Sequence, residues 1–204
     1  MSKLDEARKM LETLKTIEIG GRNNIKEGTV VALLNKFTQE KSRAFVPYFK
    51  ADFTVVKPMG DGRGRQVGSE GYDGHMKGDT FSTCFFLGDR FQRDIGPFLC
   101  AVLDISKEDA ATMTAAEIQQ TAALLLDCEG EQVGAASGQA LIEIKGIESK
   151  PVEDKKKPGT LRTYINERYV RTVKPSELGE LEEKDIVRYF GSLEAFAALM
   201  EAEG

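Results

Sequence analysis

The sequence has few of the residues from which metal sites and disulfides are built. Its 204 residues include one histidine, His75, and three cysteines, at positions 84, 100 and 128. The cysteines are odd in number, widely spaced and without a C-x-x-C pair, which argues against a disulfide framework and a structural zinc site. A single histidine in a glycine-rich segment also gives no basis for a catalytic triad or a two-histidine metal centre.

The chain also lacks a long hydrophobic run. Its longest uninterrupted apolar stretch, residues 98–103, is far shorter than the roughly 20 residues that a membrane-spanning helix requires. The first nine residues mix charged and small side chains and contain no apolar core, so they do not form a secretory signal. We therefore expect a soluble, cytoplasmic protein without a membrane partner.

Phosphate-binding glycine motifs are missing as well. The glycines of residues 60–64 do not have the G-x-G-x-x-G spacing, and no Gly-Lys-Ser/Thr follows them. Most acidic residues fall on predicted helices or turns beside other charges, as is usual for solvated faces. The sequence thus predicts no enzyme, no catalytic or metal-binding residue and no cofactor. A carboxylate–metal nuclease is the one enzymatic alternative, because such a site needs only a few carboxylates.

The charge that is present is unevenly distributed. The chain has a formal net charge of −5, but residues 177–204 carry eight acidic and two basic side chains, so the remaining 176 residues sum to +1. Such an acidic end can recruit basic partner proteins. The helical spacing of Leu193, Phe196 and Met200 equally suits an amphipathic helix docked on the body of the protein. The sequence leaves a free tail and a docked helix both open.

Five segments rich in β-branched and apolar residues predict strands. They span residues 29–37, 44–56, 80–87, 139–147 and 161–171. Apolar residues at three- and four-residue steps predict helices near residues 2–14, 95–103, 114–128 and 186–200. The phenylalanines expected in the core are Phe45, Phe49, Phe53, Phe81, Phe85 and Phe98.

This order of elements predicts a mainly β, α+β fold. It fits a five-stranded OB-like barrel with a two-helix insertion between strands 3 and 4, plus N- and C-terminal helices; an open α+β sandwich is the alternative. We divide the chain into an N-terminal helical extension (1–22), an OB-like domain (23–175) and an acidic C-terminal helical tail (176–204). Seven of residues 60–79 are glycine, which predicts a long mobile loop between the second and third strands.

Basic and aromatic residues together point to single-stranded nucleic acid, whose bases stack on aromatic rings while Lys and Arg contact the phosphates. On one face of the fifth predicted strand, Arg162, Tyr164, Asn166 and Arg168 occupy every second position. The candidate nucleic-acid-binding residues are Tyr48, Lys50, Arg63, Arg65, Tyr72, Lys77, Arg90, Arg162, Tyr164 and Arg168. The structural alternative is that the arginines are ordinary surface charges and the tyrosines half-buried packing.

Several short motifs stand at or near the beginnings of the predicted elements. They are residues 24–29 (NIKEGT), 43–56 (RAFVPYFKADFTVV), 77–80 (KGDT), 94–99 (DIGPFL) and 138–143 (GQALIE). Their order, over roughly residues 24–173, resembles tailed-phage single-stranded DNA-binding proteins of the OB-fold class. The resemblance implies a small replication or recombination accessory protein that coats single strands without catalysis. It also implies that the acidic end contacts polymerases and helicases.

We therefore expect sequence-tolerant single-stranded DNA binding in phage DNA replication or recombination, in the host cytoplasm. The acidic C-terminal segment is expected to recruit replication proteins. The alternative is a phage structural or assembly protein that uses the same barrel for protein–protein contacts. A monomer and a homodimer are both compatible with the sequence.

Overall fold

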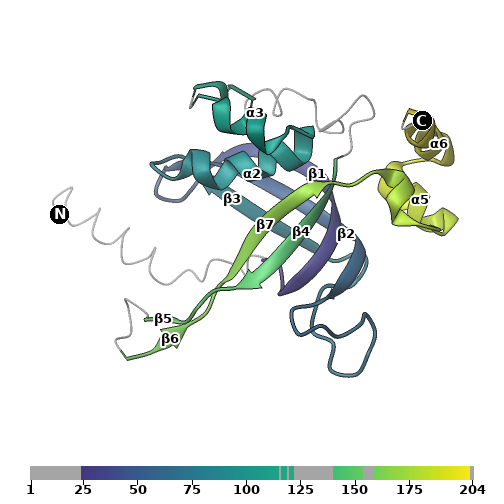
Figure 1. Cartoon of the computed structure of the whole chain (residues 1–204), viewed down its shortest axis with the longest axis horizontal. Helices are drawn as coiled ribbons and strands as arrows, with labels where there is room; N and C mark the ends of the chain where they lie inside the picture. The colour runs from purple at the N-terminus through teal and green to yellow at the C-terminus, as the bar shows by residue number, and fades with distance from the viewer. Residues whose placement is uncertain (1–23, 115, 119, 122–139, 154–158, 203–204) are drawn as a thin grey trace, which may run out of the picture.

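The computed structural model of the chain describes residues 24–114, 116–118, 120–121, 140–153 and 159–202 (Figure 1). The helix predicted near residues 2–14 lies outside the described residues, as does most of the helix predicted for 114–128. The start of the latter is confirmed by a capping box. The Thr114 N–H donates to Glu117 Oε2 at 2.7 Å, and the Glu117 N–H donates to Thr114 Oγ1 at 3.3 Å.

The fold is mixed α and β and is centred on a five-stranded antiparallel sheet. Its strands are β1 (Gly28–Lys41), β2 (Pro47–Asp61), β3 (Thr80–Phe86), β4 (Leu141–Glu148) and β7 (Ile165–Thr172), in the order β3-β2-β1-β4-β7. A separate two-stranded ribbon, β5 (Val152–Glu153) with β6 (Leu161–Arg162), extends beyond β4 and β7 (Figure 1). Among the described residues no ladder joins the edge strands β3 and β7, so the sheet is not closed into a barrel.

Helices lie on both faces of the sheet. Helices α2 (Phe91–Leu103) and α3 (Lys107–Thr112) follow β3, while the 3-10 helix η1 (Pro175–Leu178) and helices α5 (Glu183–Phe190) and α6 (Leu193–Ala202) follow β7. Helix α2 packs against the sheet near β7, whereas η1 and α5 cover part of the opposite face. No helix in the described part of the chain is both long and apolar enough to cross a membrane.

The main core forms where the inward side chains of β2 meet α2. Phe49, Phe53 and Val55 are buried and alternate with partly exposed polar residues, which confirms the predicted inward face of this strand. The Phe98 ring of α2 lies 5.2 Å from the ring of Phe37 and 5.0 Å from that of Phe85, measured between centroids. Of the six phenylalanines predicted in the core, five are buried; Phe45 is the exception.

A second apolar cluster docks the C-terminal helices on the other face. Val31, Leu33 and Leu141 of the sheet pack with Tyr189 and Phe190 of α5. Helix α5 is therefore a docked helix, which decides between the two possibilities that the sequence leaves open for this segment. The docking residues differ in part from those expected, because Leu193 and Met200 of α6 are exposed. Phe196 packs against Phe190 at a centroid distance of 4.8 Å, and Leu199 also packs against this cluster.

Replacing Phe98 by alanine should lower the free energy of unfolding by about 3–5 kcal/mol, because the change removes a fully buried ring. Urea denaturation followed by circular dichroism measures the loss. Phe86→Ala is the matched control, since Phe86 is partly exposed and its removal should cost clearly less. Equal losses for the two variants would contradict the place we give Phe98 in the core.

Candidate nucleic-acid interface

The structure separates the ten candidate residues into three groups. Four lie in the loop between β2 and β3 (Arg63, Arg65, Tyr72, Lys77), three toward the β1–β2 hairpin (Tyr48, Lys50, Arg90), and three on or beside the ribbon and β7 (Arg162, Tyr164, Arg168). The β1–β2 ladder runs from the pair Gly28–Asp61 to the pair Lys41–Pro47, a span of about 40 Å at the usual rise per residue. The loop and the hairpin are thus at opposite ends of the sheet, and the ten residues do not form one surface.

The loop after β2 is organised around the buried carboxylate of Asp61. This carboxylate accepts hydrogen bonds from the Arg63 N–H at 3.0 Å, the Arg65 N–H at 2.8 Å and Arg65 Nε at 2.6 Å. Burial alone would raise the pKa of Asp61, but the Arg65 and Arg63 donors outweigh it and lower that pKa to about 2. The predicted loop is present, and hydrogen bonds between its own residues cross-link it.

His75 is a buried structural residue of this loop, with only 4% of its surface exposed. Its Nε2 accepts the Lys26 backbone N–H at 2.9 Å, and its Nδ1 lies 3.3 Å from Asp79 Oδ2. An accepting Nε2 places the proton of the neutral ring on Nδ1, which then donates to Asp79. Burial lowers the pKa of His75 and outweighs the opposite effect of Asp79. The neutral form therefore fits this site.

The other loop candidates also have partners within the protein. Arg65 pairs with Asp73 at 2.8 Å as well as with Asp61. Lys77 forms an ion pair with Asp185 of α5, and the Tyr72 hydroxyl donates to the backbone oxygen of His75 at 2.8 Å. Arg63 is the most exposed of the four. This group holds the loop together and ties it to α5, which makes it a poor candidate for a nucleic-acid groove.

Lys50 and Tyr48 lie on the outward face of β2. Lys50 pairs with Asp52 at 2.9 Å, and the hydrogen bond to Asp52 raises the pKa of the lysine. The Tyr48 hydroxyl donates to Glu40 at 2.6 Å, while its ring lies 5.2 Å from the ring of Phe86 on β3. The two rings form an aromatic pair on the outside of the sheet, and Phe86 is partly exposed.

The turn between β1 and β2 places Phe45 in an unusual conformation. Ser42 and Val46 close the turn, with the Ser42 N–H donating to the Val46 oxygen at 2.8 Å and the Phe45 N–H donating to the Ser42 oxygen at 2.8 Å. The residue between them, Phe45, has a φ of 58°. In a three-residue hairpin loop this left-handed position favours glycine, and another residue costs about 1–2 kcal/mol there.

Among the residues that the structure describes, no packing compensates for this strain, because Phe45 is 83% exposed. Exposed Val46 follows it, and the Tyr48–Phe86 pair lies at the same end of the sheet. Exposed basic residues lie on the two connections at this end of the sheet. Lys41 and Arg43 lie at the β1–β2 turn, and Arg90 lies between β3 and α2. We call this set the tip surface: Lys41, Arg43, Phe45, Val46, Tyr48, Phe86 and Arg90. The predictions that Phe45 lies in a strand and in the core are both wrong, since β2 begins at Pro47 and Phe45 is exposed; no glycine marks the left-handed position in the sequence.

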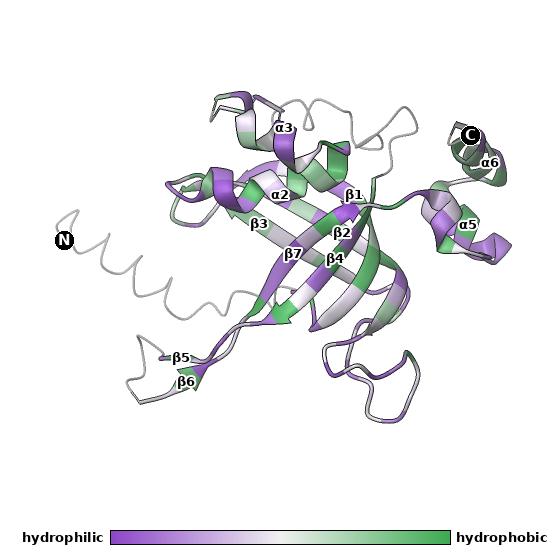
Figure 2. Cartoon of the chain, in the orientation of Figure 1, coloured by the Kyte–Doolittle hydropathy of each residue, from purple (hydrophilic) through white to green (hydrophobic). Residues whose placement is uncertain are grey.

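The third group does not share one continuous strand as predicted. The predicted strand is divided into β6, which ends at Arg162, and β7, which begins at Ile165. In the strand register, Arg162 lies opposite Val152 in the ribbon, whereas Arg168 lies opposite Lys145 of β4 in the sheet. Tyr164, between them, is 54% exposed, and hydrophilic residues form bands along β7 (Figure 2). The predicted exposure of these side chains holds, but their regular alignment does not.

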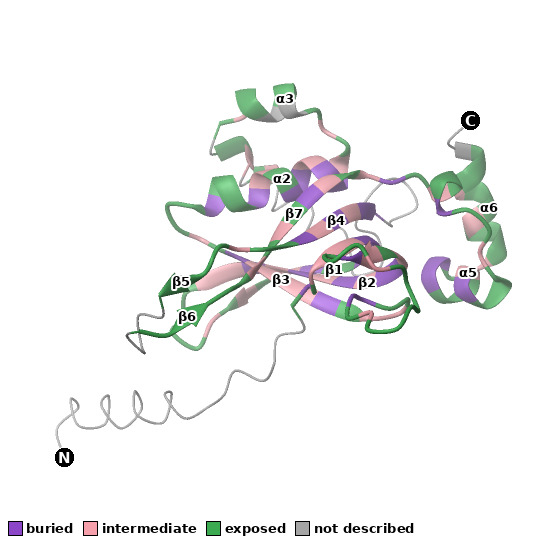
Figure 3. Cartoon of the chain, turned by 60° about the horizontal axis from the view of Figure 1, so that its bottom comes forward, coloured by how far each residue is buried: buried purple, intermediate pink, exposed green. Residues whose placement is uncertain are grey.

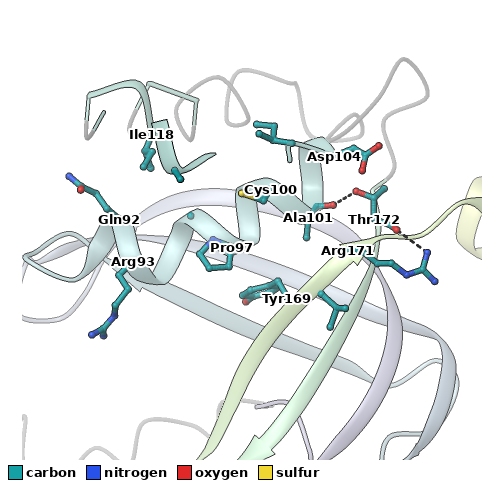
Figure 4. A pocket seen from close by; sticks show the side chains of 14 residues that line it. Gln92, Arg93, Pro97, Cys100, Ala101, Asp104, Ile118, Tyr169, Arg171 and Thr172 are labelled. Atoms are coloured by element: carbon teal, nitrogen blue, oxygen red, sulfur yellow. Dashed lines mark hydrogen bonds between the residues drawn. The ribbon is translucent and has the colours of Figure 1, made fainter. Parts of the chain in front are cut away.

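A cavity of about 380 Å³ lies between α2, the α3 region and β7 (Figure 4). Pro97, Cys100 and Ile118 contribute to its apolar lining, and the Thr172 hydroxyl at its rim donates to the Ala101 oxygen at 2.5 Å. Arg171, also at the rim, is paired with Glu143 and Glu177. In the part of the chain that the structure describes, no three His, Cys, Asp or Glu side chains are grouped to hold a metal ion.

Comparison with models of known protein families gives no match for this sequence, and neither does comparison with curated proteins. The geometry of the chain itself therefore carries the functional argument.

Acid should unfold the protein partly through Asp61. Because the pKa of this carboxyl is about 2 when folded and 3.8 ordinarily, the unfolded chain takes up the proton first. The ionised Asp61 carboxylate contributes fully to the free energy of unfolding above about pH 4, and this contribution is lost as the pH falls toward 2. Asp61→Asn should therefore lower stability at pH 7 and weaken the acid dependence, as measured by thermal unfolding at several pH values.

Asp73→Asn is the control for this measurement. Asp73 pairs with the same arginine but is more than half exposed, so its loss should have a smaller effect. If Asp61→Asn unfolds at the same temperature as the wild type at pH 7, the structural role given to this carboxylate is contradicted.

Proposed function

We propose that the protein binds single-stranded DNA without sequence preference and that the tip surface is its main contact. The observation that carries this proposal is Phe45: a large ring, almost fully exposed, at a backbone position that favours glycine. Strained residues that lack a structural reason are typical of functional sites. A base that stacks on this ring would supply the missing contact, and such stacking is worth about 1–3 kcal/mol per base.

The surroundings of Phe45 support the proposal. The Tyr48–Phe86 pair offers further aromatic surface on the outward side of β2 and β3. Lys41, Arg43 and Arg90 are exposed at this end of the sheet and would contact phosphates. These are the two components of sequence-tolerant binding to a single strand, because every base has an aromatic face and every nucleotide a phosphate.

We interpret the sheet as an OB-like barrel that is open between β3 and β7. The β1–β2 hairpin and the connection between β4 and β7 then correspond to the two loops with which OB-folds bind oligonucleotides. Tyr164, with Arg162 and Arg168, would form a second contact on the β4–β7 side. The exposed carboxylates of α5 and α6 would remain accessible to basic replication or recombination proteins.

Phe45→Gly should separate the effect of this ring on DNA binding from its effect on folding. The affinity for DNA should fall, whereas the free energy of unfolding should rise. Relief of the left-handed strain should raise the free energy of unfolding by up to about 1 kcal/mol. Loss of one stacked base should weaken binding to oligo-dT by about 5- to 150-fold. Fluorescence titration at two salt concentrations measures affinity, which should fall as salt rises, and urea denaturation measures stability.

Met59→Ala is the control, since Met59 is an exposed apolar residue of β2 outside the tip surface, and it should bind like the wild type. Tyr164→Ala tests the second contact in the same titration. Absence of wild-type binding at low salt, or unchanged affinity of Phe45→Gly, would reject the proposal. Shortening of the oligonucleotide in the presence of Mg²⁺ would favour the nuclease alternative instead.

A further inference from the structure

His75 connects the loop between β2 and β3 to the segment that enters β1. Its Nε2 accepts the Lys26 backbone N–H at 2.9 Å, and the Lys26 ammonium donates to the Gly74 backbone oxygen at 3.1 Å. The His75 ring also stacks on the ring of buried Phe81 of β3, at a centroid distance of 5.2 Å. The position of this part of the loop therefore depends on the contact between His75 and Lys26.

The same part of the loop is linked to helix α5 through Lys77. Lys77 lies two residues after His75 and pairs with the carboxylate of Asp185, which is buried. Of the two C-terminal helices, α5 carries buried side chains, whereas none of the described side chains of α6 is buried (Figure 3). A buried carboxylate that loses its cation is strongly destabilising. The docking of α5 thus depends on where the loop holds Lys77.

The contact between His75 and Lys26 requires a neutral ring. Nε2 can accept the Lys26 N–H only while it carries no proton, so the proton of the neutral ring is on Nδ1, which lies 3.3 Å from Asp79 Oδ2. A second proton on the ring would place two donors, Nε2–H and the Lys26 N–H, against each other. Neither donor would then have an acceptor at this contact, which is unfavourable.

The surroundings of the ring oppose its protonation on balance. Burial lowers the pKa of His75 most strongly, the hydrogen bond to Asp79 raises it, and the Lys26 ammonium lowers it further, so that the pKa lies below its ordinary 6.5. The other contacts of His75 carry no charge. Phe81 on the face of the ring is apolar, and the Tyr72 hydroxyl donates to the backbone oxygen of His75.

A polar cavity of about 420 Å³ lies beside this contact. Its lining includes His75, Lys26 and Asp79, together with the uncharged Asn24 and Thr80. The cavity has the volume and the polar groups that water needs. A charged ring that leaves Lys26 would therefore be hydrated there.

We propose that protonation of His75 in mild acid releases the β2–β3 loop from Lys26, and that Lys77 transmits this release to α5. In the open state the ring is hydrated and has its ordinary affinity for protons. Each pH unit below about 6.5 should therefore raise the ratio of open to closed molecules about tenfold, until the closed form itself takes up the proton. This range lies well above the pH at which Asp61 is protonated. The inference does not depend on DNA binding.

Amide hydrogen exchange, followed by NMR from about pH 8 to about pH 5, measures the opening. After correction for the intrinsic exchange rate, the protection of the Lys26 amide should fall about tenfold per pH unit below about 6.5. The Gly191 amide, which donates to the Val187 oxygen at the end of α5, should lose protection over the same range. The Leu34 amide, which donates to Ala140 within the sheet, should keep its protection, because the opening is local.

Two variants separate the two steps of the proposal. In His75→Gln the side-chain oxygen can still accept the Lys26 N–H but cannot titrate, so the protection of both amides should no longer depend on pH in this range. In Lys77→Met the Lys26 amide should respond as in the wild type, whereas the Gly191 amide should be poorly protected at every pH. Lys36→Met, which changes an exposed lysine of β1, is the control and should match the wild type.

The wild type alone also tests the proposal, because His75 is the only histidine of the chain. The ¹⁵N signals of its ring should show a neutral form protonated at Nδ1 and a pKa below the ordinary 6.5. A neutral ring protonated at Nε2, a pKa at or above 6.5, or a Lys26 amide whose protection does not change with pH would overturn the proposal. A Lys26 amide that responds without the Gly191 amide would overturn the link to α5. DNA is absent from every sample, so failure of the proposed DNA binding would leave these results unchanged.

Discussion

The contact on which the fold most depends is the packing of Phe98 between the two edges of the open sheet. Phe85 of β3 and Tyr169 of β7 come from strands that no ladder joins in the described part of the chain, and both rings contact Phe98, at centroid distances of 5.0 and 5.4 Å. In a closed barrel, backbone hydrogen bonds would hold these edges together. Here a helix side chain does so by aromatic packing, and the curvature of the sheet therefore depends on where α2 lies.

A small polar network completes this junction. The Tyr169 hydroxyl donates to Glu167 at 2.8 Å, and the Thr83 side chain of β3 hydrogen-bonds the same carboxylate. Burial raises the pKa of Glu167 and raises that of Tyr169 well above its ordinary value. The tyrosine therefore stays protonated at neutral pH and remains a donor. Buried polar groups between the two strands are thus satisfied without a ladder.

The sequence predicts the elements of this fold better than the contacts between them. The alternation along β2 identifies its buried face, because period-two burial is a local property. Phe45 escapes prediction because its conformation depends on how β1 and β2 are paired, and no glycine marks the turn. The loop cations could not be recognised as structural, because Lys77 finds its partner, Asp185, more than one hundred residues away. Charge and ring content alone do not tell a paired lysine from one that is available to a ligand.

The strain at Phe45 is unfavourable for folding and would have to be offset by the proposed binding of DNA. In the free protein the ring contributes almost no burial, and its backbone conformation costs about 1–2 kcal/mol. In the proposed complex with DNA, a base stacked on this ring would return about 1–3 kcal/mol. In that proposed complex the ring would lower the free energy of the complex relative to that of the free protein, and this difference would be its contribution to affinity. Backbone hydrogen bonds between Ser42 and Val46 already hold the turn, so the backbone of Phe45 would not need to be ordered on binding, which would limit the entropy lost.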